Sequence, residues 1–150
     1  MQTTEALYRY ARSRGHAVYR RPLRHTRAMS VQMPDGRCAI AISKLPLSVR
    51  LERRCLAHEL GHCETGAFYT YRAQAAEITS CELRAERWAI CFLIPYDDLC
   101  RQIAAGLQVP HALAEHFEVP EAMVLDAIAY YKAIGLAVPS PALSPGATRL

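Results

Sequence analysis

No stretch of this 150-residue chain approaches the 18 or so uninterrupted apolar residues of a membrane-spanning helix. The first residues, MQTTEALYRYARSRGH, have an amphipathic pattern and lack the hydrophobic core of a signal peptide. There is no internal repeat. Hydrophobic residues make up 51% of the chain and charged residues 21%, which is typical of a soluble globular domain. We therefore expect a cytoplasmic protein that does not associate with membranes.

The cysteines form no CxxC pair and lack the density of a disulfide-rich scaffold. Several of them fall within predicted helices, where a free cysteine acts as a small hydrophobic residue. Without a signal peptide, reduced thiols that pack in the interior are expected. The six positions are Cys38, Cys55, Cys63, Cys81, Cys91 and Cys100.

Charge is distributed unevenly along the chain. Residues 1–54 contain 12 Lys and Arg against 3 Asp and Glu, whereas residues 55–150 contain 6 against 11. A basic half can bind nucleic acid or an acidic partner, or it can be a solvated arginine-rich surface. Charge alone does not choose between these interpretations.

Helical patterns dominate outside residues 17–43. Ser48 is a good N-cap, and Gly106 and Val119-Pro120 separate the later helices. Residues 64–79 show no sustained period and are predicted to form a loop. The predicted helices are residues 3–14, 48–63, 80–95, 97–105, 110–117 and 121–134.

Residues 28–43 have the pattern of a β-hairpin. Apolar residues alternate on either side of the turn Pro34-Asp35-Gly36, as in AMSVQM and RCAIAIS. We predict an α+β fold in which a small antiparallel sheet packs beside a helical body. Residues 1–137 would form a single domain with a helical C-terminal region at about 96–135. The Pro- and Ser-rich tail, 138–150, is predicted to be disordered.

The segment CLAHELGHCE, residues 55–64, contains an HExxH motif formed by His58, Glu59 and His62. Histidines at i and i+4 lie on one helical face, where two imidazoles can converge on one zinc ion at about 2.1 Å. The alternative is an ordinary helix that carries two histidines by chance. On a helical wheel the pair lies opposite the stripe of Leu56 and Leu60, on a second, semi-apolar face. That position favours a helix between a core and a cleft.

A catalytic zinc needs three protein ligands and an open position. The helix CELRAERWAICFLIP places Glu82 and Glu86 on the same side as Ala85 and Ala89. Two carboxylates at i and i+4 repel each other, and a cation between them and the histidines would remove the repulsion. Alternatively, both are surface glutamates favoured by the helix dipole.

CLAHELGHCETG and ELRAERWAICFLIP together resemble the ImmA/IrrE family of metallo-endopeptidases, particularly its compact phage and mobile-element members. The resemblance covers about residues 50–134 and includes the helical segment ALAEHFEVPEAMVLDAIAYYKAIG. It implies a zincin-like fold of the gluzincin type. It also implies Zn²⁺ bound by His58, His62 and Glu82, with Glu59 as the catalytic carboxylate. Glu86 departs from the usual Asn or Asp, and it would either support a histidine or only lie nearby.

The resemblance further implies an activity, which is cleavage of a cognate helix-turn-helix repressor, usually encoded next to the peptidase. Such cleavage would derepress phage, mobile-element or stress genes. Tyr69 and Tyr71 are both conceivable donors to the reaction's oxyanion, and the strand at 38–42 could present an edge to an extended substrate.

Two other functions stay open. One is a zinc-containing binding module that sequesters a repressor or another protein without cutting it. The other is DNA binding by LAEHFEVPEAMVLDAI, which we disfavour because its second helix carries no Arg or Lys. The remaining histidines are not predicted to bind metal; they are His16, His25, His111 and His116.

Overall fold

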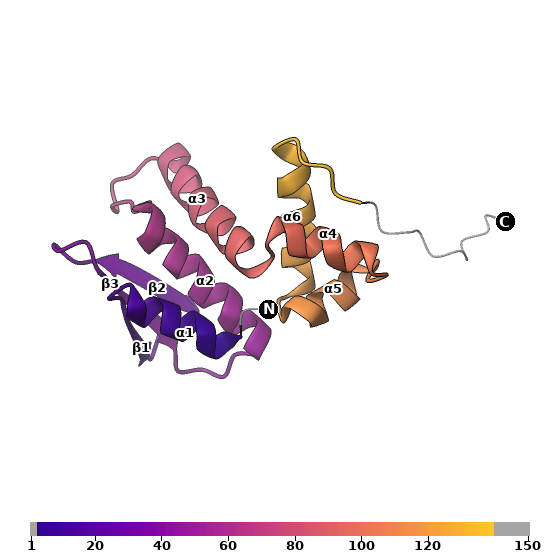
Figure 1. The fold of residues 1–150 in the computed structure, drawn as a ribbon. Coiled ribbons are helices and arrows are strands. Elements are labelled where there is room, and N and C mark those ends of the chain that lie inside the picture. The colour runs from indigo at the N-terminus through magenta and orange to yellow at the C-terminus, as the bar shows by residue number, and fades with distance from the viewer. Residues whose placement is uncertain (1–2, 140–150) are drawn as a thin grey trace.

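The computed structural model describes residues 3–139, which form six helices and a three-stranded sheet (Figure 1). The helices are α1 (Thr4–Ser13), α2 (Val49–Thr65), α3 (Ala75–Leu93), α4 (Tyr96–Ala104), α5 (Pro110–Phe117) and α6 (Glu121–Ala133). The strands are β1 (Ala17–Arg21), β2 (Ala28–Gln32) and β3 (Cys38–Ser43). The predicted α+β class is confirmed. Most of the predicted disordered tail, from residue 140 onward, lies outside the described residues.

The predicted helices are present, and the start of α3 is the main difference. Ser48 caps α2 as expected, because its hydroxyl accepts a hydrogen bond from the Leu51 amide at 3.2 Å. Helix α3 begins at Ala75, whereas the pattern predicted a start near Ser80. Its N-cap, Gln74, makes no side-chain capping bond, so the sequence carries no start signal there.

The sheet is mixed rather than wholly antiparallel, which corrects the prediction. Its strand order is β1-β3-β2. Strands β2 and β3 form the predicted antiparallel hairpin, and β1 pairs in parallel with the other edge of β3. The loop after β1 connects it to β2 at the opposite edge of the sheet, and the hairpin turn then leads into β3, which lies between them. Strand β3 is therefore central, and β2 has one unpaired edge.

Helix α2 lies at the centre of the fold, between the sheet and α1 on one side and α3 on the other (Figure 1). Its stripe of Leu56 and Leu60 is fully buried and packs with Ile40 and Ile42 of β3, although Val49 at its first turn is exposed. Arg53 is also fully buried. Its guanidinium donates to the carbonyls of Phe117 and Glu118 at the end of α5, which links α2 to the C-terminal helices.

A disulfide joins Cys38, at the start of β3, to Cys63 near the end of α2. The prediction of reduced thiols is therefore wrong for this pair. Cys55, Cys81, Cys91 and Cys100 are free as predicted, but Cys91 is exposed and does not pack in the interior. Packing of α2 on the sheet brings Cys38 and Cys63 together with a Cα–Cα distance of 6.0 Å, and their spacing of 25 residues gave no sign of it. Among residues 3–139, no helix combines the length and apolar composition of a membrane span.

Replacing both Cys38 and Cys63 with alanine should lower the free energy of unfolding by about 3.5 kcal/mol, the loop-closure value for a separation of 25 residues. Urea unfolding under non-reducing conditions measures the change. Cys91→Ala, at an exposed free thiol, is the matched control and should have little effect. A wild-type protein whose unfolding does not respond to a thiol reductant would contradict the bond.

Candidate metal centre

Two packed helices supply the residues of the site. His58, Glu59 and His62 lie on α2, and Glu82 and Glu86 lie on α3. Within α2 the HExxH spacing brings the two imidazole rings to a centroid distance of 4.9 Å. The sequence-predicted ligands therefore come together from segments 20 residues or more apart in the chain.

The three predicted ligands converge on one point. Glu82 Oε2 lies 2.9 Å from His58 Nε2, and Glu82 Oε1 lies 3.4 Å from His62 Nε2. Two atoms that each bind one tetrahedral zinc at about 2.1 Å lie about 3.4 Å apart. One ligand atom from each residue falls within 4.8 Å of the others. The donor set and its spacing fit a zinc ion.

The second nitrogen of each histidine is held by an acceptor. His62 Nδ1 donates to the carbonyl of Ala67 at 2.5 Å, and His58 Nδ1 donates to Glu86 Oε2 at 2.9 Å. Because both acceptors require a proton on Nδ1, the lone pair of each Nε2 is free to bind a metal. Of the two roles left open for Glu86, the geometry favours support of a histidine.

Electrostatics around Glu86 reinforce this arrangement. Arg54 donates to Glu86 Oε1 at 3.0 Å. Burial raises the pKa of Glu86, but the hydrogen bonds from His58 and Arg54 outweigh it and leave the pKa below the ordinary glutamate value. Burial likewise lowers the pKa of His58, and the bond to Glu86 with the nearby carboxylates raises it overall. Glu86 is thus an ionised acceptor at neutral pH.

Glu59 lies beside the ligands and is held by a residue that sequence reasoning missed. Ser30 Oγ, on β2, donates to Glu59 Oε2 at 2.6 Å. The other oxygen, Oε1, makes no hydrogen bond within residues 3–139. No sequence pattern connects Ser30 to Glu59, because only the packing of β2 on α2 brings them together.

The structure distinguishes between Tyr69 and Tyr71, which the sequence left as equal candidates for an oxyanion donor. Tyr69 OH donates to Glu82 Oε1 at 2.9 Å, and Tyr69 lines the cleft at the site. Tyr71 is 91% exposed and its hydroxyl accepts from Arg72. Tyr69 is therefore the tyrosine placed to contact a bound substrate.

Gly61 sets the close approach of α2 and α3. A Cβ added at Gly61 would lie 2.3 Å from the carbonyl oxygen of Ala85 and 2.8 Å from its Cα. Because both atoms belong to the backbone, no side-chain rotation relieves the clash. The close contact is therefore made by Gly61 of α2 and the backbone of Ala85 in α3.

Gly61→Ala should destabilise the protein by about 1–3 kcal/mol, because overpacking forces the backbones apart. In an open helix the same change would stabilise by up to about 1 kcal/mol, so the expected sign is reversed. Urea unfolding measures it, with Ser80→Ala on the exposed side of α3 as the control. Zinc affinity should fall as well, since Glu82 moves away from the histidines. A Gly61→Ala protein as stable as the wild type would contradict the close contact.

A cleft of about 1100 Å³ opens over the site. His58, Glu59, His62 and Glu82 lie on its wall together with residues 23–30 from β2 and the loop before it. The sequence model of the IrrE N-terminal-like peptidase domain matches residues 11–128. The chain belongs to this peptidase family. The match spans the sheet, both site helices and most of the C-terminal helices, and no curated protein shows significant similarity to the chain.

Membership of the IrrE-like peptidase family supports a metallopeptidase-type function, and it confirms the family suggested by the motifs. The family assignment itself identifies neither the metal nor the substrate. This chain also shows three side chains that could hold a metal ion, His58, His62 and Glu82, on the wall of an open cleft.

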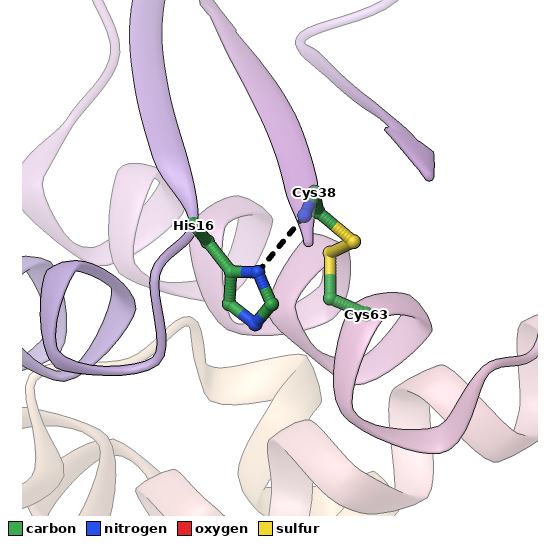
Figure 2. A group of neighbouring side chains, drawn as sticks. All are labelled: His16, Cys38 and Cys63. Atoms are coloured by element: carbon green, nitrogen blue, oxygen red, sulfur yellow. Dashed lines mark hydrogen bonds between the residues drawn. A yellow bond between two sulfur atoms is a disulfide. The ribbon is translucent and has the colours of Figure 1, made fainter. Parts of the chain in front are cut away.

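A second group of potential ligands includes Cys63, the residue that follows His62 in α2. His16, Cys38 and Cys63 are buried together, and the Cys38 amide donates to His16 Nδ1 at 3.0 Å (Figure 2). His16 Nε2 contacts Glu64 Oε1 at 2.9 Å. The two sulfurs are joined to each other, so neither offers a thiolate, and both ring nitrogens of His16 are engaged. We therefore assign this group a structural role.

The other histidines lie outside the ligand group. His25 lines the cleft and is exposed. His111 contacts Glu121 at 3.9 Å, and the His116 ring packs against Phe117. His16 lies in the loop between α1 and β1, and it is buried at 7% exposure. Its burial follows from the hydrogen bonds to Cys38 and Glu64, which the sequence pattern did not reveal.

Proposed function

We propose that this protein is a zinc-dependent endopeptidase that cleaves a helix-turn-helix transcriptional repressor in the cytoplasm. The main support for an enzyme is that Glu82 contacts Nε2 of both His58 and His62. Beside them lies the carboxylate of Glu59, whose Oε1 makes no hydrogen bond within residues 3–139. Three protein ligands under an open cleft are typical of catalytic rather than structural zinc sites.

Each residue of the site would have a separate role in peptide hydrolysis. Zinc, when bound, would lower the pKa of a water molecule toward about 7 and polarise a peptide carbonyl. Glu59 would accept a proton at Oε1 and pass it to the leaving amine, while Ser30 fixes Oε2. With Glu82 engaged as a metal ligand, the Tyr69 hydroxyl, which now donates to Glu82, would be available to donate to the oxygen of the substrate carbonyl.

An extended substrate would pair with the sheet next to the site. The predicted edge was the strand at 38–42, but β3 is central; β1 and β2 are the edge strands, and β2 is the one beside the cleft. Residues 28–30 of β2 line the cleft. A peptide added along this edge would gain backbone hydrogen bonds without a closed pocket.

The proposed substrate is a folded repressor rather than proteins in general. A domain this small has little room for a closed specificity pocket, so selectivity would come from contacts with a folded partner. The repressor itself is proposed from the resemblance of the motifs.

The zinc-loaded protein should make one discrete cut in the helix-turn-helix repressor encoded beside its gene and should leave casein uncut. Gel electrophoresis and mass spectrometry of the products test both outcomes. The control is the same mixture after zinc removal with a chelator, which should show no cut. Vigorous degradation of casein would refute the restricted substrate range, and a repressor that is bound but never cut would favour the binding module instead.

A further inference from the structure

Two arginines on the cleft wall are left without an acidic partner. Arg24 and Arg27 lie in the loop between β1 and β2, line the cleft and are exposed. Neither forms an ion pair with any residue from 3 to 139. Among the described residues, no acidic side chain therefore neutralises these two positive charges on the wall of the cleft above the candidate metal centre.

Several other arginines of the basic half do have partners. Arg14 pairs with Glu64, Arg20 with Glu52, and Arg37 with Asp35. Arg54, which also lines the cleft, pairs with Glu86 at 3.0 Å and with Asp126 at 3.6 Å. Arg9, Arg21 and Arg50 likewise form no ion pair with residues 3–139, but they do not line the cleft, so what distinguishes Arg24 and Arg27 is their position on its wall.

The acidic groups of the cleft cannot neutralise these arginines. Glu59 accepts from Ser30, Glu82 contacts both histidines, and Glu86 is bound by His58 and Arg54. Each carboxylate is held at the floor by its own partners. An acidic side chain of a peptide bound in the cleft would therefore find both arginines free to pair with it.

The position of the two arginines matches an extended peptide. Arg27 directly precedes β2, and the Arg27 carbonyl already accepts from the Ser43 amide of β3 at 2.8 Å. Within residues 3–139, the opposite edge of β2 has no strand partner, since β2 pairs only with β3. A peptide laid along that edge would place its side chains next to both guanidinium groups.

Accepting the proposed peptidase function, we propose that the substrate segment carries Asp or Glu side chains near the scissile bond and that Arg24 and Arg27 bind them. The two arginines then determine specificity and take no part in the bond-breaking chemistry. Arginine suits this role because its planar guanidinium binds a carboxylate with two hydrogen bonds.

The test compares two short fluorescein-labelled peptides with Thr/Val flanks, one with two central glutamates and one with glutamines in their place. The zinc-loaded full chain with Glu59→Gln would hold them without cutting, and fluorescence anisotropy gives each affinity. The glutamate peptide should bind about three- to tenfold tighter at low salt, and the difference should shrink as salt screens the charges. The double variant Arg24→Ala and Arg27→Ala should bind both peptides equally.

The matched control is the double variant Arg12→Ala and Arg101→Ala. It removes the same charge from exposed positions on α1 and α4 and should keep the preference. A glutamate peptide that does not bind, or binds no tighter than its glutamine twin, would overturn the proposal. So would an equal loss in the control, or a double-stranded DNA that displaces the acidic peptide. Repressor cleavage by the wild-type protein is scored separately, so a failure of the peptidase function is distinguishable from a failure of this preference.

Discussion

His58→Ala or His62→Ala should abolish tight zinc binding, whereas the wild-type chain should bind a single zinc ion. Each histidine offers Nε2 to the same point as Glu82, and its Nδ1 is already fixed by a carbonyl or a carboxylate. Loss of an outer partner of a ligand typically costs about 10- to 100-fold in metal affinity. Loss of a ligand itself should cost more, because His25, the other histidine that lines the cleft, lies outside the group of converging ligand atoms.

Glu82 and Glu86 of α3 should differ in their effect on zinc binding. Glu82→Ala should weaken zinc binding substantially, and Glu86→Ala should weaken it less, within about 10- to 100-fold. Metal analysis of the purified variants and chelator competition measure the order. His111→Ala, at an exposed histidine outside the site, is the control and should keep full zinc content. Zinc lost from Glu86→Ala but retained by Glu82→Ala would show that the ligand assignment is wrong.

Glu59→Gln should keep the fold and the zinc but lose proteolysis by about 10²- to 10⁴-fold, the usual cost of removing a general base. The amide is nearly isosteric and can still accept the hydrogen bond from Ser30, yet it cannot take up a proton. The rate of repressor cleavage, measured beside zinc content and unfolding, separates chemistry from folding. The matched control is Glu77→Gln, at an exposed glutamate in the first turn of α3.

This experiment also separates the two functions that the sequence left open. A binding module should tolerate Glu59→Gln, since gripping a partner needs no general base. A Glu59→Gln protein that cleaves the repressor at a similar rate would eliminate the mechanism. A wild-type protein that only binds the repressor would support the module.

The local sequence determined the helices and the main part of the site. Helix α2 follows from the Ser48 cap and the Leu56 and Leu60 stripe, which act within a few turns of one segment. The i,i+4 spacing of His58 and His62 likewise follows from helix geometry alone. Glu82 could be named as the third ligand once both motifs were considered together, because their combination resembles one family.

Only the tertiary structure decided the contacts between distant segments. The bond from Ser30 to Glu59, the disulfide of Cys38 and Cys63, and the parallel pairing of β1 with β3 join residues more than 20 positions apart. No periodicity or cap reports such contacts, because they depend on how α2 packs on the sheet. The close approach of Gly61 to Ala85 is of the same kind. The helical pattern predicts which face of α2 is apolar. It does not predict the distance from α2 to α3, because that distance depends on the atoms that pack between the two helices.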